Sequence, residues 1–295
     1  MSEPGGSGLV VVDKPGGLTS HGVVARVRRL AGTRKVGHAG TLDPMATGVL
    51  LLGVNRATRL LGHLMLTEKA YDATIRFGVA TTTDDAEGEE VSRAPAGHLT
   101  DEAVAAALPR FVGAIEQVPT AVSAIKVDGR RAYARVRAGE EVDLPARPVT
   151  VHELTAGPVR HLAGDLAEVD VHVRCSSGTY VRAIARDLGE ALGVGGHLTA
   201  LRRTAVGPFD LATARTLEQL AESFALLPLS EVARACFPVH PLDEEQARDV
   251  GFGRPLTGVE LRAPGPVAVF APDGTFLALY EAAGDRARPI AVFTG

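Results

Sequence analysis

One carboxylate of this 295-residue sequence stands in a glycine-rich stretch that suits the presentation of a reactive side chain. Asp43 lies between Gly40 and Gly48, directly precedes Pro44, and is followed by an apolar run at residues 49–54. A residue before proline is restricted to extended backbone, while glycine permits sharp turns and lets a ligand approach the main chain. The pattern indicates an aspartate presented beside a buried strand, where a carboxylate can act as a covalent nucleophile.

A second interpretation of the same dipeptide is structural. Asp-Pro is a common helix start, with Asp43 as the N-cap and Pro44 as the first helical residue. On local spacing alone, the helix-cap interpretation is favoured over a presented nucleophile.

Longer motifs favour the presented nucleophile over the helix cap at Asp43. In chain order they are residues 11–20 (VVDKPGGLTS), 35–48 (KVGHAGTLDPMATG), 69–71 (KAY), 81–88 (TTTDDAEG), 119–133 and 178–182 (GTYVR). Together they resemble the TruB family of tRNA pseudouridine synthases, and they span about the first two hundred residues in the family's order. The resemblance implies isomerisation of uridine to pseudouridine at position 55, in the T-loop of tRNA. That reaction breaks the bond from N1 of the base to C1′ of the ribose and joins C5 to C1′, with no metal or cofactor required.

The resemblance also assigns the three residues of the catalytic set. Asp43 is the nucleophile, and Arg182 is the cation that offsets the desolvation of its carboxylate. Tyr71 stacks on the target base and is a candidate to take up a proton. Taken without the resemblance, Arg182 is an arginine on a helix face and Tyr71 is a core residue of an alternating strand.

Four more residues are assigned to substrate binding. His38 matches the histidine that takes the space of the flipped-out base, although a glycine-flanked histidine also suits a general base or a metal ligand; no partners at ligand spacing support a metal. Lys14 follows a strand, where it could contact backbone phosphate or brace the catalytic loop. Asp85 matches a family carboxylate near that loop, but Asp84 and Asp85 also suit a simple turn. Tyr180 is the fourth candidate.

The distribution of charge favours a nucleic-acid partner although the formal net charge is −4. Residues 14–69 carry nine Lys and Arg against two acids, residues 126–137 five against one, and residues 174–203 five against two. The motifs that resemble the synthases are therefore mostly in basic segments, as a phosphate backbone requires. Such basic runs are also typical of solvated helix faces.

The composition is that of a folded soluble protein, with 45% hydrophobic and 22% charged residues. No stretch is apolar enough for a membrane span, and the first eight residues are polar and Gly-rich, so we expect a cytoplasmic protein. Cys175 and Cys236 lack metal-site spacing and are expected to be reduced.

Periodicity predicts strands at residues 9–12, 49–54, 71–79 and 168–174, and helices at residues 20–30, 55–64, 100–108 and 181–192. Ser20 is the predicted cap of the first helix. Three more short strands are predicted at residues 266–270, 276–281 and 290–293. The fold class is therefore α+β, with a mixed, largely antiparallel sheet, flanking helices and a small C-terminal β-barrel.

We predict two domains, a catalytic domain over residues 1–235 and a second domain over residues 240–295. The resemblance implies that the second is a PUA-like RNA-binding barrel. It also implies that the proline-bounded, cationic segment at about 117–149 is the family's thumb, which closes over the T-arm; otherwise that segment is a surface helix–loop.

Two alternative functions stay open at this point. The related guide-RNA-directed pseudouridine synthases share the aspartate motif but act within a multi-protein particle. A tRNA-folding chaperone or RNA-binding module with a silent isomerase site is the other alternative. We expect an enzyme that acts on the T-arm of tRNA as a monomer, without an obligate protein partner.

Overall fold

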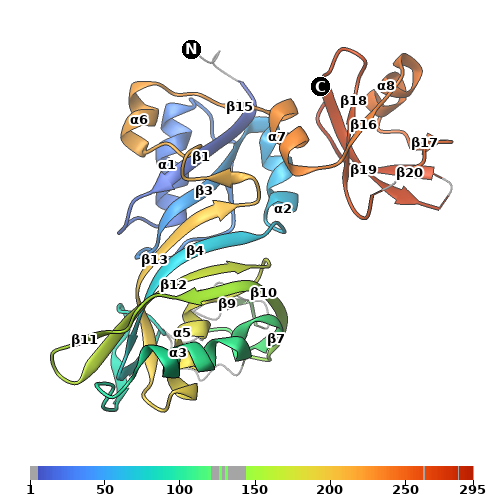
Figure 1. The fold of residues 1–295 in the computed structure, drawn as a ribbon. Coiled ribbons are helices and arrows are strands. Elements are labelled where there is room, and N and C mark those ends of the chain that lie inside the picture. The colour runs from blue at the N-terminus through green and yellow to red at the C-terminus, as the bar shows by residue number, and fades with distance from the viewer. Residues whose placement is uncertain are drawn as a thin grey trace. The chain divides into compact units, whose positions relative to one another are not determined.

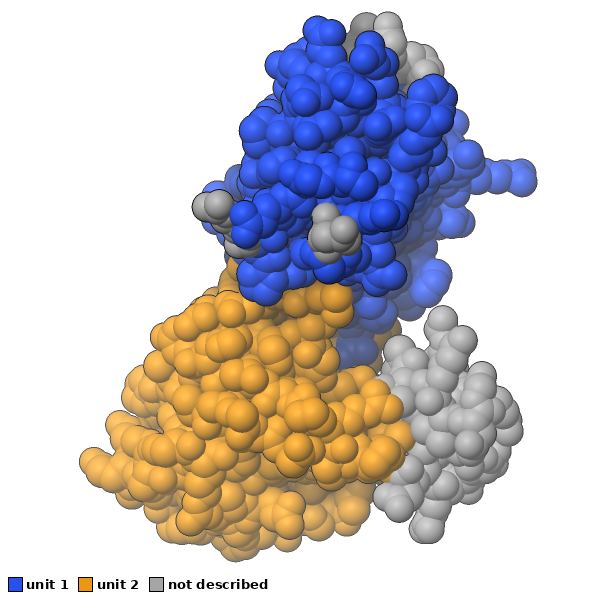
Figure 2. Space-filling model, turned by 90° about the vertical axis from the view of Figure 1, so that its right-hand side faces the viewer, with its two compact units in different colours: residues 1–43, 49–65, 207–295 blue, residues 44–48, 66–206 orange. Residues whose placement is uncertain are grey.

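The computed structural model describes residues 6–120, 126–127, 130–131, 144–261, 263–284 and 286–294. Most of the predicted thumb at 117–149 lies outside these residues. The chain forms two compact units, coloured blue and orange in Figure 2. Unit 1 comprises Met1–Asp43, Val49–Met65 and Gly207–Gly295, and unit 2 comprises Pro44–Gly48 and Leu66–Val206. Asp43 is therefore the last residue of unit 1 before the chain enters unit 2.

Unit 1 has a sheet in which β1 is flanked by β15 and β3, and β2 pairs with β3. These strands are β1 (Gly8–Lys14), β2 (Val36–Ala39), β3 (Thr47–Val54) and β15 (Leu227–Pro228). Its helices include α1 (Ser20–Leu30), α6 (Leu217–Glu222) and α7 (Leu229–Cys236). The predicted helix at 55–64 is a 3-10 helix, η1 (Asn55–Leu60), followed by one α-helical turn, α2 (Leu61–Leu64).

The predicted cap of α1 is wrong by one residue. Thr19 is the N-cap, and its hydroxyl accepts a hydrogen bond from the backbone N–H of Gly22. Ser20 is the first helical residue instead, and its hydroxyl bonds to a residue far along the chain.

Unit 2 is built on an antiparallel sheet in the order β13-β4-β12-β10-β7. Its strands are β4 (Lys69–Phe77), β7 (Gly113–Gln117), β10 (Arg147–Ala156), β12 (Leu166–Cys175) and β13 (Gly196–Val206), with β11 (Arg160–Leu162) added at β12. The helix α5 (Val181–Ala191) packs against β13 and β4, and α3 (Asp101–Ala107) is followed by the 3-10 helix η2 (Leu108–Phe111). Unit 2 also contains the hairpin of β5 (Val79–Thr81) and β6 (Glu90–Arg93) and the short pair of β8 (Lys126–Val127) and β9 (Arg130–Arg131). Figure 1 shows β13, β4, β12 and β10 as neighbouring strands.

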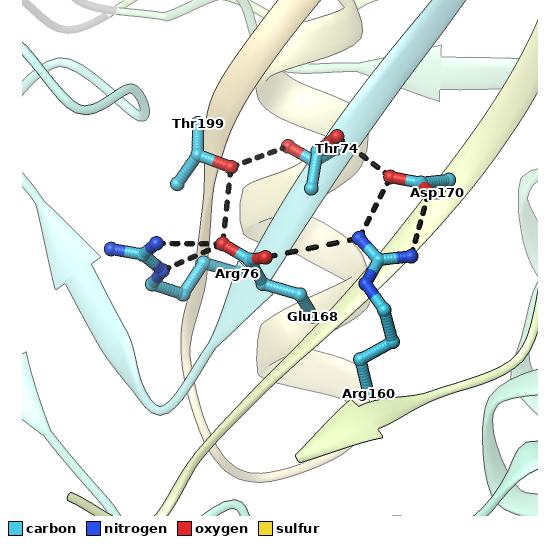
Figure 3. Close-up of polar contacts among 6 residues, drawn as sticks. All are labelled: Thr74, Arg76, Arg160, Glu168, Asp170 and Thr199. Carbon is cyan, nitrogen blue, oxygen red and sulfur yellow. Dashed lines mark hydrogen bonds and ion pairs between the residues drawn. The ribbon is translucent and has the colours of Figure 1, made fainter. Parts of the chain in front are cut away.

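Strand β4 shows how the sequence pattern builds this sheet. Tyr71, Ala73, Ile75 and Phe77 alternate along the strand and are all buried, so they form its core face. The opposite face carries a network of polar side chains from neighbouring strands (Figure 3), made of Thr74, Arg76, Arg160, Glu168, Asp170 and Thr199. Opposite charges placed across strands in this way stabilise the pairing modestly and keep the outer face solvated.

The C-terminal part of unit 1 is a curled sheet in the order β16-β18-β19-β20-β17. Its elements are β16 (Val239–Pro241), α8 (Glu244–Gly251), β17 (Leu256–Thr257), β18 (Val267–Phe270), β19 (Phe276–Ala283) and β20 (Arg286–Val292). Val250, Val269 and Tyr280 lie at the centre of its own hydrophobic core. The α+β class and the small C-terminal β module are as predicted, while the division at residues 235–240 stays a prediction. None of the described helices is long and apolar enough to cross a membrane.

Candidate active site

The loop that holds Asp43 connects β2 to β3. Residues 40–46, all of them described, contain no helix, so the helix-cap interpretation of Asp43–Pro44 is wrong. Gly40 has a φ of 82°, in the left-handed region that disfavours other residues. The chain therefore turns sharply after β2, and the half-buried Asp43 lies in an irregular segment between two strands.

The segment that follows Asp43 belongs to unit 2. Thr47 and Gly48 pair in parallel with Arg202 and Arg203 of β13. Gly48 has a φ of 97°, and a Cβ atom at this position would lie 2.2 Å from the carbonyl oxygen of Arg203. Only glycine fits this approach, and the pairing fixes one end of the Asp43 loop on the sheet of unit 2.

Tyr71 lies on β4, which pairs with β13 on the side opposite β3. Arg203, which pairs with Gly48, also pairs with Tyr71 of β4 on its other side. Arg203 is 1% exposed, and sequence analysis did not single it out because a basic residue is expected at the surface. Burial, and then the charge of Arg203, lower the pKa of Lys69 to about 8. The strand segment around Tyr71 therefore carries two buried cationic side chains, which favour an anion nearby.

Arg182 and Asp85 form a buried ion pair in unit 2. Nη1 of Arg182 lies 3.3 Å from Oδ2 of Asp85, and the two side chains are 7% and 4% exposed. Nη1 also donates a hydrogen bond to the carbonyl oxygen of Thr83 at 2.8 Å. These two contacts fix the side chain of Arg182 at the start of α5. It is therefore a buried cation and not a solvated residue of a helix face.

The carboxylate of Asp85 is held by its own turn as well. It accepts hydrogen bonds from the hydroxyl of Thr83 at 2.5 Å and from the backbone N–H of Glu87 at 3.0 Å. Asp84 has a φ of 58°, the left-handed conformation of a turn residue, and burial raises the pKa of its carboxyl although Arg186 opposes the shift. The turn interpretation fits both aspartates, and Asp85 in addition holds Arg182 through the buried ion pair.

The start of α5 is fixed by a residue that sequence analysis missed. Tyr180, the N-cap, has no side-chain cap of its own. The side-chain amide of Gln117 accepts from the backbone N–H of Tyr180 at 2.8 Å and donates to its carbonyl at 3.0 Å. No local pattern signals this role, because the two residues belong to different elements far apart in the chain.

Lys14 and His38 belong to unit 1. Lys14 is fully buried, and its ammonium donates hydrogen bonds to the carbonyl oxygens of Leu18 at 2.7 Å and Pro15 at 3.0 Å. These two contacts hold the turn at residues 15–18, which leads into α1. His38 lies in β2 opposite Leu52, half-buried, with its ring edge-on to that of His21.

Within the part of the chain that the structure describes, no three His, Cys, Asp or Glu residues are grouped as a metal site. Cys175 and Cys236 are both free. Burial raises their pKa values to about 11 and about 12, so both thiols are protonated at neutral pH and poor ligands.

Gly48→Ala tests the attachment of the loop to β13. We expect the free energy of unfolding to fall by about 1–3 kcal/mol from backbone strain, because the new Cβ meets the backbone of Arg203 at a disfavoured φ. Urea denaturation measures this loss. Gly62→Ala is the matched control, since a Cβ there meets nothing within 4 Å and the position is helical. Equal stabilities of the two variants would contradict the attachment.

Comparison with known proteins agrees with the fold and the motifs. Residues 28–181 match the model of the TruB family pseudouridylate synthase N-terminal domain. Residues 182–236 match the tRNA pseudouridylate synthase B C-terminal domain, and residues 237–294 match the C-terminal domain of tRNA pseudouridine synthase II.

Curated relatives match almost the whole chain. The tRNA pseudouridine synthase B of Arthrobacter sp. (strain FB24) is 59% identical, over 97% of this chain and 96% of the relative. That of Thermobifida fusca (strain YX) is 58% identical, over 98% of this chain and 99% of the relative. Among solved structures, a chain in the crystal structure of a Cbf5-Nop10-Gar1 complex is 25% identical with a TM-score of 0.74, covering 97% of this chain and 85% of that chain. This chain belongs to the TruB family of pseudouridylate synthases.

Proposed function

We propose that this chain converts uridine to pseudouridine at position 55 in the T-loop of tRNA, and that it acts without a protein partner. The observation that carries this proposal is the similarity to proteins named tRNA pseudouridine synthase B, at 58–59% identity over at least 97% of the chain. A tRNA-modifying enzyme of this kind acts in the cytoplasm.

Asp43 is the proposed nucleophile. Its carboxylate adds to the target nucleotide, at C6 of the uracil or at C1′ of the ribose, and the bond from N1 to C1′ breaks. The detached uracil turns and C5 bonds to C1′. The bond between the carboxylate and the nucleotide breaks, which regenerates Asp43, and the hydrogen on C5 leaves as a proton while N1 takes one up. Arg182 offsets the desolvation of the carboxylate, and the buried ion pair with Asp85 holds that guanidinium in place.

The target base has to leave the T-loop before this chemistry. Extruding a nucleotide costs a few kcal/mol in lost stacking, and a side chain in the vacated space offsets part of that cost. We assign that side chain to His38, and we assign the stacking surface for the flipped base to Tyr71. Tyr180 is a further candidate for binding the substrate. Lys14 braces the turn before α1, in agreement with its burial and its two carbonyl contacts.

The two alternatives make different predictions for the isolated protein. A guide-dependent enzyme leaves bare tRNA unmodified, and the relatives named tRNA pseudouridine synthase B favour the independent enzyme. A chaperone binds tRNA without producing pseudouridine, and the family's aspartate, tyrosine and arginine at Asp43, Tyr71 and Arg182 favour the enzyme.

Mapping of the modified nucleotide tests the proposal. The purified chain is incubated with an unmodified tRNA transcript, and pseudouridine is then labelled with a carbodiimide that stops reverse transcriptase. We expect one new stop, at position 55, and none in a transcript that carries cytidine there. A stop at another uridine would overturn the T-loop assignment, and no stop at all would overturn the isomerase.

Gln117→Leu tests the placement of Tyr180 and Arg182. The substitution removes the amide that accepts from the part-buried N–H of Tyr180 and donates to its carbonyl. That carbonyl keeps its hydrogen bond from the N–H of Ile184, so the loss is about 1 kcal/mol. We expect slower pseudouridine formation and a lower melting temperature. Gln117→Glu, which still accepts from the N–H, is expected to fall between leucine and wild type; a fully active leucine variant would contradict the role.

A further inference from the structure

The hydroxyl of Ser20 makes two hydrogen bonds to the residue directly before Asp43. Ser20 Oγ donates to the carbonyl oxygen of Leu42 at 3.0 Å and accepts from the backbone N–H of Leu42 at 2.9 Å. All of these groups belong to unit 1, and Ser20 and Leu42 are 1% and 4% exposed. One side chain thus satisfies both polar groups of the main chain at Leu42.

These contacts are not needed to begin α1. Thr19 already caps the helix through the N–H of Gly22, so the hydroxyl of Ser20 is available to a distant segment. The helix itself is a firm support, because Val23, Val24 and Val27 anchor its inner face in the core. Lys14 ties together the turn that leads into it. Ser20 therefore connects a packed helix to an irregular loop.

The loop has no regular secondary structure around Leu42. Residues 40–46 are neither helix nor strand, and the sharp turn at Gly40 precedes Leu42 by two residues. Pinning both the N–H and the carbonyl of Leu42 restricts the peptide bond that joins it to Asp43. The direction in which the carboxylate leaves the main chain is thereby restricted as well.

We propose that Ser20 is a positioning residue for Asp43, a role that rests on the proposed function of Asp43 as nucleophile. Its hydroxyl orients the Leu42–Asp43 peptide so that the carboxylate is directed at the reacting nucleotide before the nucleotide arrives. A reactive group that is misplaced by about 1 Å loses roughly 100-fold in rate, so the chemical step depends on this orientation.

Ser20→Ala tests the proposal by removing only the hydroxyl. Single-turnover release of tritium from tRNA that carries [5-³H]uridine reports the chemical step, and filter binding of the same tRNA reports affinity. We expect the rate to fall about 10- to 100-fold with an unchanged Kd for tRNA. Ser20→Thr, which keeps the hydroxyl, is expected to retain most of the rate.

Thr19→Ala is the matched control for general damage to α1. It removes the helix cap, lowers the melting temperature by about 2–4 °C, and leaves the contacts to Leu42 in place, so its rate should stay near wild type. The proposal is overturned if Ser20→Ala is as fast as Thr19→Ala, or if its loss is matched by an equal loss of tRNA affinity. Failure of wild-type protein to release tritium would instead overturn the proposed function itself.

Discussion

Asp43→Asn is expected to lower the single-turnover rate of tritium release by at least roughly 10⁴-fold, as removal of a covalent nucleophile does in other enzymes. The amide has nearly the shape of the carboxylate but is neutral and does not add to the nucleotide. Binding of tRNA, measured on filters, should be retained, because the loop is attached to β13 through backbone pairing that the substitution leaves in place.

Asp72→Asn is the matched control for this substitution. Asp72 lies on β4 next to Tyr71, but its side chain is 62% exposed and pairs with His172 on the outer face of the sheet. Wild-type activity is expected for this variant. An Asp43→Asn protein that released tritium at a rate within tenfold of wild type would show that another group is the nucleophile.

Asp85→Ala is expected to produce the largest loss of stability among the substitutions considered. The variant removes the carboxylate from the buried ion pair with Arg182, and breaking a buried pair in this way costs about 3–5 kcal/mol. Catalysis should fall as well, since Arg182 is no longer held in position. Urea unfolding measures the first effect and tritium release the second.

Asp170→Ala gives a closely matched comparison, because Asp170 makes the same kinds of contact in a different environment. It accepts from the hydroxyl of Thr74 and from the guanidinium of Arg160 on the exposed face drawn in Figure 3, where its side chain is 60% exposed. Water replaces these partners, so the stability loss should be several times smaller than for Asp85→Ala. Similar losses of unfolding free energy for both variants would show that burial does not increase the contribution of the Arg182–Asp85 pair to stability.

The helices and strands that pack against a core were the predictable part of this fold. The apolar period over residues 20–30 and 181–192 indicated α1 and α5 closely, and alternation indicated β4 and β12, because burial of one face dictates those patterns. Local propensity alone did not identify the N-cap of α1. Ser20 is as good a cap as Thr19 by type, but in the structure its hydroxyl bonds to the distant Leu42 while Thr19 caps the helix.

The candidate site was predictable only through the resemblance to a family. Spacing alone favoured a helix cap at Asp43, and nothing local pairs Arg182 with Asp85 or Gln117 with Tyr180, because those contacts join elements far apart in the sequence. Arg203 was missed for a related reason. Basic residues are usually exposed, and only the register of β13 between β3 and β4 shows why this one is buried.

Tritium release by the wild-type chain tests the central claim most directly. The purified protein alone, in buffer with a metal chelator, is incubated with unmodified tRNA transcript labelled at C5 of uridine, and the tritium released to water is counted per tRNA. Joining C5 to the ribose expels that hydrogen, so we predict one equivalent of tritium per tRNA from the target uridine. Binding of tRNA without any release would contradict an independent pseudouridine synthase and leave a guide-dependent enzyme or an RNA chaperone.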